Sequence, residues 1–104
     1  MVQTFDSAAF KAAMERKETL VVDFWASWCG PCRMLAPVME QVSEELSDKA
    51  TFVKIDVDDN PDLAREYSIM SIPCVMVYKN GELAGKNVGF GAKAAMLEFI
   101  EKYL

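Results

Sequence analysis

The order of apolar and polar positions predicts alternating strands and helices along the chain. Leu20–Ala26 is an almost continuous apolar run, and Thr51–Val57 is interpreted as a second buried strand. Runs of this kind are typical of strands that are covered on both faces of a sheet. Between them, apolar residues recur at helical spacing from about Pro31 to Ser47, and a last helix is predicted from about Ala92 to Tyr103.

Residues typical of helix and strand ends complete this pattern. Val2–Phe5 predicts a short first strand, and Asp6 is placed to cap the helix that follows it. Asn60 and Pro61 combine an N-cap residue with a proline at the first helical position. We therefore expect a short third helix that ends at about Tyr67.

A β-hairpin is indicated near the end of the chain by Asn80-Gly81, which separates the predicted strands Cys74–Tyr78 and Ala84–Val88. The elements then follow the order βαβαβαββα. Strands separated by helices are expected to pair in parallel, and the hairpin strands are expected to be antiparallel. The sequence therefore predicts an α/β fold, with a mixed five-stranded sheet flanked by helices on both faces, in a single domain over residues 1–104.

Length and charge narrow the possible classes of function. A chain of 104 residues suits one domain with its own hydrophobic core. Sixteen acidic and eleven basic residues leave a net charge of −5, which does not attract nucleic acid or anionic lipid. No apolar run approaches the roughly 18 residues that cross a membrane, and the first residues do not resemble a signal peptide. We therefore expect no nucleic-acid or membrane partner and a cytoplasmic location.

The counts of cysteine and histidine exclude several kinds of site. Three cysteines and no histidine rule out a Cys–His nucleophile pair, a Ser–His–Asp triad and a Cys/His zinc site. A metal site built from cysteines alone would require Cys74 to meet the other two. Walker A and G-x-G-x-x-G patterns for binding phosphate are also absent. We therefore expect neither a bound metal nor a nucleotide.

The segment Trp28-Cys29-Gly30-Pro31-Cys32 carries the most informative chemistry, because it joins a buried strand to the start of a helix. A helix N-terminus stabilises the thiolate, which is the reactive form of cysteine. We expect Cys29 at an exposed turn, where it would attack a substrate disulfide, and Cys32 in the first helical turn, where it would resolve the mixed disulfide. The uncharged Gly30-Pro31 pair favours a reductant.

Other uses of the two cysteines remain open from their spacing alone. A C-x-x-C pair also occurs as half of a metal site or as two inert core residues. The position between a strand and a helix, together with the preceding Trp28, favours redox use over these alternatives.

Two charged residues interrupt the runs that should be buried. Asp23 lies within the first run, and Lys54 lies within the second. A buried carboxyl must be protonated or paired, so Lys54 is the obvious partner. A carboxyl with a raised pKa below the active turn could accept the proton of Cys32. Alternatively, Asp23 and Lys54 reach solvent at the ends of the sheet.

The motifs together resemble those of thioredoxins over the whole length of the chain. The matching segments, in order, are Val22–Ala26, Trp28–Cys32, Asp58–Pro61, Ser71–Pro73, Lys79–Glu82 and Val88–Gly89. The resemblance implies a thioredoxin-like fold and a protein disulfide reductase. In such a protein Cys29 would be the nucleophile, Cys32 the resolving thiol and Asp23 the buried acid–base group beside Lys54.

The resemblance also implies where substrates bind. Pro73 would follow a cis peptide bond and keep the backbone of Ile72 open, so that an extended substrate segment could pair with it. The expected substrate-binding residues are Trp28, Gly30, Pro31, Ile72, Pro73, Gly89 and Phe90.

Electrons would reach the reversible Cys29–Cys32 disulfide indirectly from NADPH, through thioredoxin reductase, or from a ferredoxin-dependent equivalent. The domain itself would bind no cofactor. Its partners would be this reductase and disulfide-containing proteins, and we expect a monomer.

Several residues depart from the common thioredoxin pattern. Arg33 replaces the usual lysine, Ile69-Met70 replaces a frequent Val-Arg pair, and Phe90 stands where a small residue is usual. Cys74 follows Pro73 where threonine is usual. It is expected close to the active pair, either as a small semi-buried residue or as a regulatory thiol and alternative disulfide partner.

Two further functions remain open. Some thioredoxin-like domains serve as binding modules in larger complexes without using their cysteines. In a second alternative, Cys29 and Cys32 from two chains hold a bridging metal or an iron–sulfur cluster.

Overall fold

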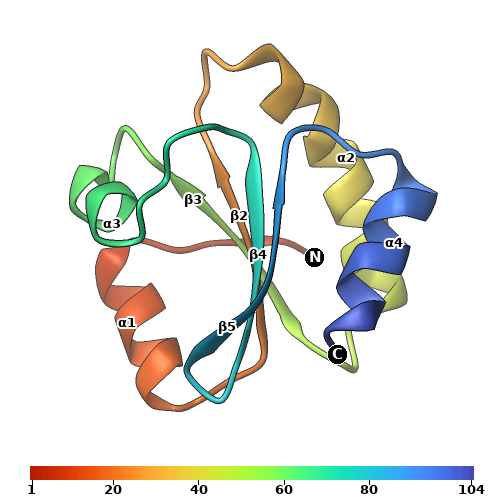
Figure 1. The fold of residues 1–104 in the computed structure, drawn as a ribbon, viewed down its shortest axis with the longest axis horizontal. Helices are drawn as coiled ribbons and strands as arrows, with labels where there is room; N and C mark the ends of the chain where they lie inside the picture. Colours follow the sequence, from red (N-terminus) through yellow and green to blue (C-terminus); the bar gives the residue numbers. More distant parts are fainter.

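The computed structural model describes residues 1–104 as a five-stranded mixed sheet between two pairs of helices (Figure 1). The elements are β1 (Gln3–Thr4), α1 (Ser7–Glu15), β2 (Leu20–Trp25), α2 (Gly30–Glu45), β3 (Thr51–Asp56), α3 (Pro61–Glu66), β4 (Cys74–Lys79), β5 (Glu82–Val88) and α4 (Lys93–Lys102). The predicted order and the mixed sheet are confirmed. None of the four helices combines the length and the apolar character needed to cross a membrane.

The strands are ordered β1-β3-β2-β4-β5, and β4 differs from the prediction. We expected every pair of strands separated by a helix to run in parallel, but β4 is antiparallel to β2. Helix α3 explains the difference, because its six residues rise only about 9 Å while a six-residue strand spans about 20 Å. The chain therefore does not return to the far end of the sheet before β4 begins.

Each face of the sheet packs against one pair of helices. On one face, Phe10 of α1 and Leu63 of α3 pack against Phe24 in the centre of the sheet. On the other face, α2 and α4 contribute Leu35 and Ile100 to a second cluster. Because successive strand residues point to opposite faces, the apolar run of β2 supplies both clusters. This explains why the run is almost continuous.

Local chemistry sets the ends of these elements as predicted. The carboxylate of Asp6 accepts the backbone N–H of Ala9 at 2.8 Å and caps α1. The hairpin turns at Asn80, where φ is +55°, and at Gly81, where φ is +79°, as an Asn-Gly turn requires.

Asn60 is the N-cap residue of α3, as predicted, but its side chain makes no capping hydrogen bond to the helix. Its Oδ1 accepts the N–H of Ser7 at 3.0 Å instead, so the amide joins α3 to the start of α1. The predicted N-cap position of Asn60 is therefore confirmed, while its side chain is used for a contact with α1.

Three loops meet at one edge of the sheet, the upper edge in Figure 1. They are the loop between β2 and α2, the loop between α3 and β4, and the loop between β5 and α4. The antiparallel direction of β4 brings the second and third loops to this edge. The cysteine motif lies in the first of them.

Candidate active site

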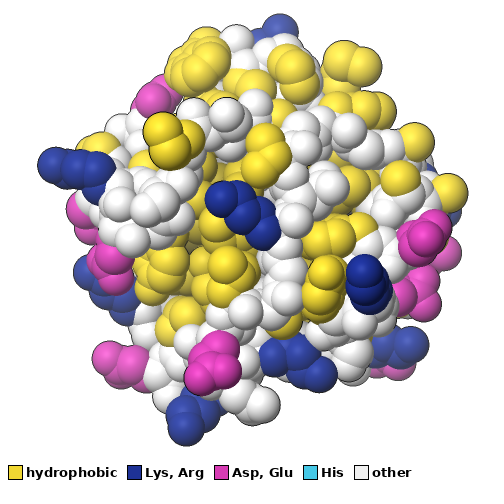
Figure 2. Space-filling view, in the orientation of Figure 1, with side chains coloured by type: hydrophobic (Ala, Val, Ile, Leu, Met, Phe, Trp, Pro, Cys, Tyr) yellow, Lys and Arg dark blue, Asp and Glu magenta, His cyan; other side chains and the backbone are white.

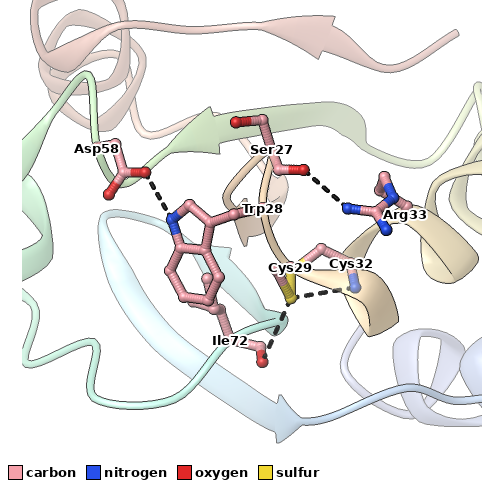
Figure 3. Close-up of a disulfide and its surroundings, with 7 residues drawn as sticks. All are labelled: Ser27, Trp28, Cys29, Cys32, Arg33, Asp58 and Ile72. Carbon is pink, nitrogen blue, oxygen red and sulfur yellow. Dashed lines mark hydrogen bonds between the residues drawn. A yellow bond between two sulfur atoms is a disulfide. The ribbon is translucent and has the colours of Figure 1, made fainter.

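Cys29 and Cys32 form a disulfide at the N-terminus of α2 (Figure 3). Cys29 has an extended backbone and is the N-cap residue, and its Sγ accepts the backbone N–H of Cys32 at 3.2 Å. Pro31 lies in the first turn, where a missing N–H has no cost. The sulfur that precedes the helix therefore already interacts with one of its free N–H groups.

The expected exposure of Cys29 was wrong. The residue is only 5% exposed, and Cys32 is buried as predicted. Ala26 lies in the same buried cluster, and Val57 and Ile72 pack against it. These neighbours belong to separate loops, so their cover over the N-cap position could not be read from local sequence.

The loop before β4 lies against the disulfide. The Ile72–Pro73 peptide bond is cis, as the resemblance implied. The carbonyl oxygen of Ile72 lies 3.9 Å from Sγ of Cys29. Gly89, at φ +96°, donates its N–H to the carbonyl of Pro73 at 2.8 Å, which fixes the third loop beside the second. A backbone segment is thus presented next to the reactive sulfur.

Several large apolar side chains of these loops and of the start of α2 are exposed. Trp28 is 67% exposed and Met70 is 93% exposed, and Met34 and Phe90 are also exposed. Figure 2 shows hydrophobic side chains gathered along the upper edge, whereas most charged side chains lie at the sides and the lower edge. Such a patch marks a binding surface more often than a structural feature.

Two polar contacts brace the cysteine loop. The indole Nε1 of Trp28 donates to Oδ2 of Asp58 at 2.8 Å, and Nη1 of Arg33 donates to the carbonyl of Ser27 at 3.0 Å (Figure 3). Sequence reasoning gave Asp58 no role, because it lies 30 residues from Trp28. The available signals were its place just after a buried strand and its position in the matching segment Asp58–Pro61.

Below the disulfide, a cavity of about 330 Å³ connects Cys32 with Asp23 and Lys54. Asp23 is 4% exposed, and its Oδ1 has no hydrogen-bond partner in the protein. Burial raises the pKa of this carboxyl to about 7, and the charge of Lys54 works in the opposite direction. The alternative in which Asp23 reaches solvent at the end of the sheet is therefore wrong.

Lys54 is the direct neighbour of Asp23 in the sheet, because the two residues are register partners in β3 and β2. The lysine is half-buried, and its Nζ lies 5.2 Å from the centre of the Trp25 ring. A cation over an indole face is stabilised by the ring electrons. Lys54 is thus the neighbour of Asp23, as the resemblance implied, but no salt bridge joins the two side chains.

Cys74 is a free thiol at the start of β4, and it is fully buried rather than semi-buried. It packs in the cluster under α1 and α3, which is a different cluster from that of Cys29 and Cys32. Burial raises the pKa of the thiol, and the charges of Lys86 and Asp23 make smaller, opposed contributions. Its regulatory role stays a prediction.

No group of three or more His, Cys, Asp or Glu side chains converges in a way that could hold a metal ion. The geometry at this edge therefore consists of a dithiol pair, a presented backbone segment, an apolar surface and a buried carboxyl. Together these groups can exchange a disulfide with a bound polypeptide.

Comparisons with known proteins agree with this reading of the geometry. The thioredoxin family model matches residues 1–102. A thioredoxin of Bacillus subtilis is 49% identical over 85 residues, which cover 82% of each chain, and one of Rickettsia typhi is 41% identical over 98% of each chain. Among solved structures, a Plasmodium falciparum thioredoxin superposes with a TM-score of 0.91 at 36% identity, covering 99% of this chain and 100% of the other. Chloroplastic thioredoxin z superposes with a TM-score of 0.87 at 37% identity, covering 98% of this chain and 93% of the other.

Proposed function

Because this chain belongs to the thioredoxin family of protein disulfide oxidoreductases, we propose that it reduces disulfides in protein substrates, with Cys29 as the attacking thiol. The contact between Sγ of Cys29 and the N–H of Cys32 supports this assignment most directly. In the reduced protein the same N–H, and the positive end of the α2 dipole, would stabilise a thiolate at Cys29. Cys32 lies deeper and is suited to the second step.

In the first step, the Cys29 thiolate attacks one sulfur of the substrate disulfide. The substrate S–S bond breaks, a mixed disulfide forms, and the departing substrate thiolate takes a proton from solvent. The carbonyl of Ile72, 3.9 Å from Cys29 Sγ, and the cis-linked Pro73 support binding of an extended substrate strand at this point. Gly30, Pro31, Gly89 and the exposed rings of Trp28 and Phe90 would complete the binding surface.

In the second step, Cys32 gives up its proton and attacks Cys29 Sγ. The mixed disulfide breaks, the second substrate thiolate leaves and is protonated, and the Cys29–Cys32 disulfide remains. Two electrons have then passed from the protein to the substrate. Asp23 is the proposed acceptor of the Cys32 proton, because both residues line the same cavity and the carboxyl has a pKa of about 7. The charge of Lys54 lowers that pKa.

The proposed cycle closes when thioredoxin reductase returns two electrons from NADPH to the disulfide, or when a ferredoxin-dependent enzyme does so. We further propose that residues 1–104 act as one domain, as a monomer and in the cytoplasm. The family likeness supports the reductase partner, since thioredoxins are generally reduced by such enzymes.

Reduction of insulin with a small dithiol as electron donor tests the proposal. The wild type should accelerate the reaction strongly, and both Cys29→Ser and Cys32→Ser should abolish the acceleration. Only Cys32→Ser should accumulate a mixed disulfide with the substrate, which mass spectrometry would locate at Cys29. Cys74→Ala is the matched control, because it removes a cysteine and keeps the active pair.

Other outcomes would point to the other functions. A wild type that is no faster than the dithiol alone would favour the binding module. Stoichiometric iron or zinc in the purified protein would favour a bridging centre between two chains.

A further inference from the structure

A groove of about 530 Å³ is lined by residues of α3, by residues of the loop between α3 and β4, and by Trp28. Ile72, whose carbonyl oxygen lies 3.9 Å from Cys29 Sγ, is among the lining residues. Met70 lines the groove too, and Ala64 and Arg65 are among its lining residues on α3. The groove therefore shares Trp28 and Ile72 with the proposed substrate-binding surface and adds residues of α3 to it.

The lining of the groove is mostly apolar and carries one charge. Six of its nine lining residues are hydrophobic, and Arg65 is the one ionisable residue among them. The three salt bridges of the chain are formed by other cations, and the neighbouring Glu66 pairs with Lys11. Asp58 accepts the indole N–H of Trp28, and Asp62 of α3 accepts the hydroxyl of Ser7. Arg65 therefore offers a positive charge to whatever occupies the groove.

We propose that this groove selects substrate segments that place an apolar side chain near the reacting cysteine and a carboxylate further along, where it pairs with Arg65. This inference rests on the proposed function, because the occupant is the polypeptide whose disulfide Cys29 attacks. An extended segment sends alternate side chains to one side, at about 6.6 Å spacing, so one segment can supply both groups to the same groove. The exposed, flexible Met70 adapts to apolar side chains of different shapes.

The net charge of the protein has the opposite sign to Arg65, so the two effects on an acidic peptide can be told apart. The chain carries a net charge of −5, so its long-range field disfavours acidic peptides. A preference for acidic segments must therefore come from a nearby cation. An exposed ion pair of this kind is expected to change kcat/KM by about twofold to fivefold, and the effect should weaken as salt is added.

Disulfide-bonded peptides that differ at a single position provide the test. Each peptide carries leucine next to the cysteine and Glu, Gln or Lys two to four residues away, with one series on each side of the cysteine. The wild type should favour Glu over Lys in at least one series. Arg65→Gln should remove the preference, and Arg65→Glu should reverse it.

Arg16→Gln is the matched control, since it removes the same charge from a distant arginine that pairs with Glu18. It should leave the ratio of kcat/KM for the Glu peptide to kcat/KM for the Lys peptide unchanged. If the wild type shows no charge preference in either series, the inference is overturned. It is also overturned if Arg16→Gln loses the preference for Glu as fully as Arg65→Gln does. The peptides with Gln keep the two proposals apart, because failure to reduce them at all would contradict the oxidoreductase function itself.

The preference for an apolar side chain near the cysteine is tested separately. Replacing the leucine of the peptide by serine should lower kcat/KM with the wild type, and Met70→Gln should shrink that difference while leaving the charge preference in place. An undiminished leucine preference in Met70→Gln would remove Met70 from the selecting surface.

Discussion

Lys54 lies directly across from Asp23 on the neighbouring parallel strand, and its charge lowers a carboxyl pKa that burial raises. The raised value of about 7 places this carboxyl near half-ionisation at neutral pH. A group in that state can both accept and return a proton. The same shift has a cost for stability that depends on pH.

Asp23→Asn should stabilise the oxidised protein at pH 9 and have little effect at pH 4. The folded carboxyl keeps its proton up to about pH 7, whereas the unfolded one releases it near 3.8, so stability falls as the pH rises between these values. At about 1.4 kcal/mol for each pH unit, the gain from removing the ionisable group should approach about 4 kcal/mol at pH 9. Denaturant unfolding followed by circular dichroism measures it.

Asp48→Asn serves as the control for this measurement, because Asp48 is exposed in the turn after α2. It should shift the unfolding free energy by no more than about 0.5 kcal/mol at either pH. Equal stabilisation of Asp23→Asn at both pH values would contradict the raised pKa.

Lys54→Met should raise the pKa of Asp23 further. The substitution keeps most of the apolar stem and removes the charge that lowers this pKa. The carboxyl resonance of Asp23, followed by NMR against pH, should therefore titrate at higher pH than in the wild type. The pH dependence of the second chemical step, measured as decay of the mixed disulfide, should move in the same direction. A downward shift would show that Lys54 does not act through its charge.

Asp58→Ala should weaken the reduction of protein disulfides by about twofold to tenfold in kcat/KM. Without its acceptor, the exposed Trp28 ring loses the hydrogen bond that holds it beside the disulfide, a contact worth about 0.5–1.5 kcal/mol. In combination with Trp28→Phe, which removes the donor, the two losses should not add.

Asp59→Ala is the neighbouring control for this pair, because it removes an adjacent exposed carboxylate while the indole hydrogen bond to Asp58 remains. If it has the same effect as Asp58→Ala, local charge rather than the hydrogen bond governs the reaction.

Cys74 should resist modification as long as the protein is folded. Its thiol is 1% exposed and its pKa is raised by burial, so both access and thiolate formation are disfavoured. After reduction, iodoacetamide should alkylate Cys29 rapidly and label Cys74 only when denaturant is added. A crosslink or adduct at Cys74 after mild oxidation of the folded protein would instead support the regulatory thiol.

Patterns within single elements predicted most of the fold. The continuous apolar run of β2 and the Asn80-Gly81 turn are local signals, and both produced the expected structure. The direction of β4 depended on whether the connection through α3 was long enough to return across the sheet. That is a comparison of lengths between elements, which no pattern within one element contains.

In the candidate site, too, local features could be predicted and contacts between distant segments could not. The motif around Cys29 and Cys32 was evident because its chemistry is carried by adjacent residues. The cover over Cys29, the contact between Trp28 and Asp58 and the position of Arg65 on the groove all join segments that lie far apart in the chain. Such contacts arise from the topology and become visible only when the loops and α3 are placed at the same edge of the sheet.

The position of β2 at the centre of the sheet also has a consequence for synthesis of the protein. β2 ends at Trp25, but its partner β4 begins only at Cys74. At about 5–20 residues per second, a ribosome leaves this apolar segment without one of its neighbours for about 3–10 seconds. In the unfolded segment a carboxyl with its ordinary pKa of 3.8 is ionised at neutral pH, and a charge within an apolar strand opposes aggregation. The carboxyl that destabilises the finished fold at high pH is therefore expected to make this segment less prone to aggregation before β4 is available.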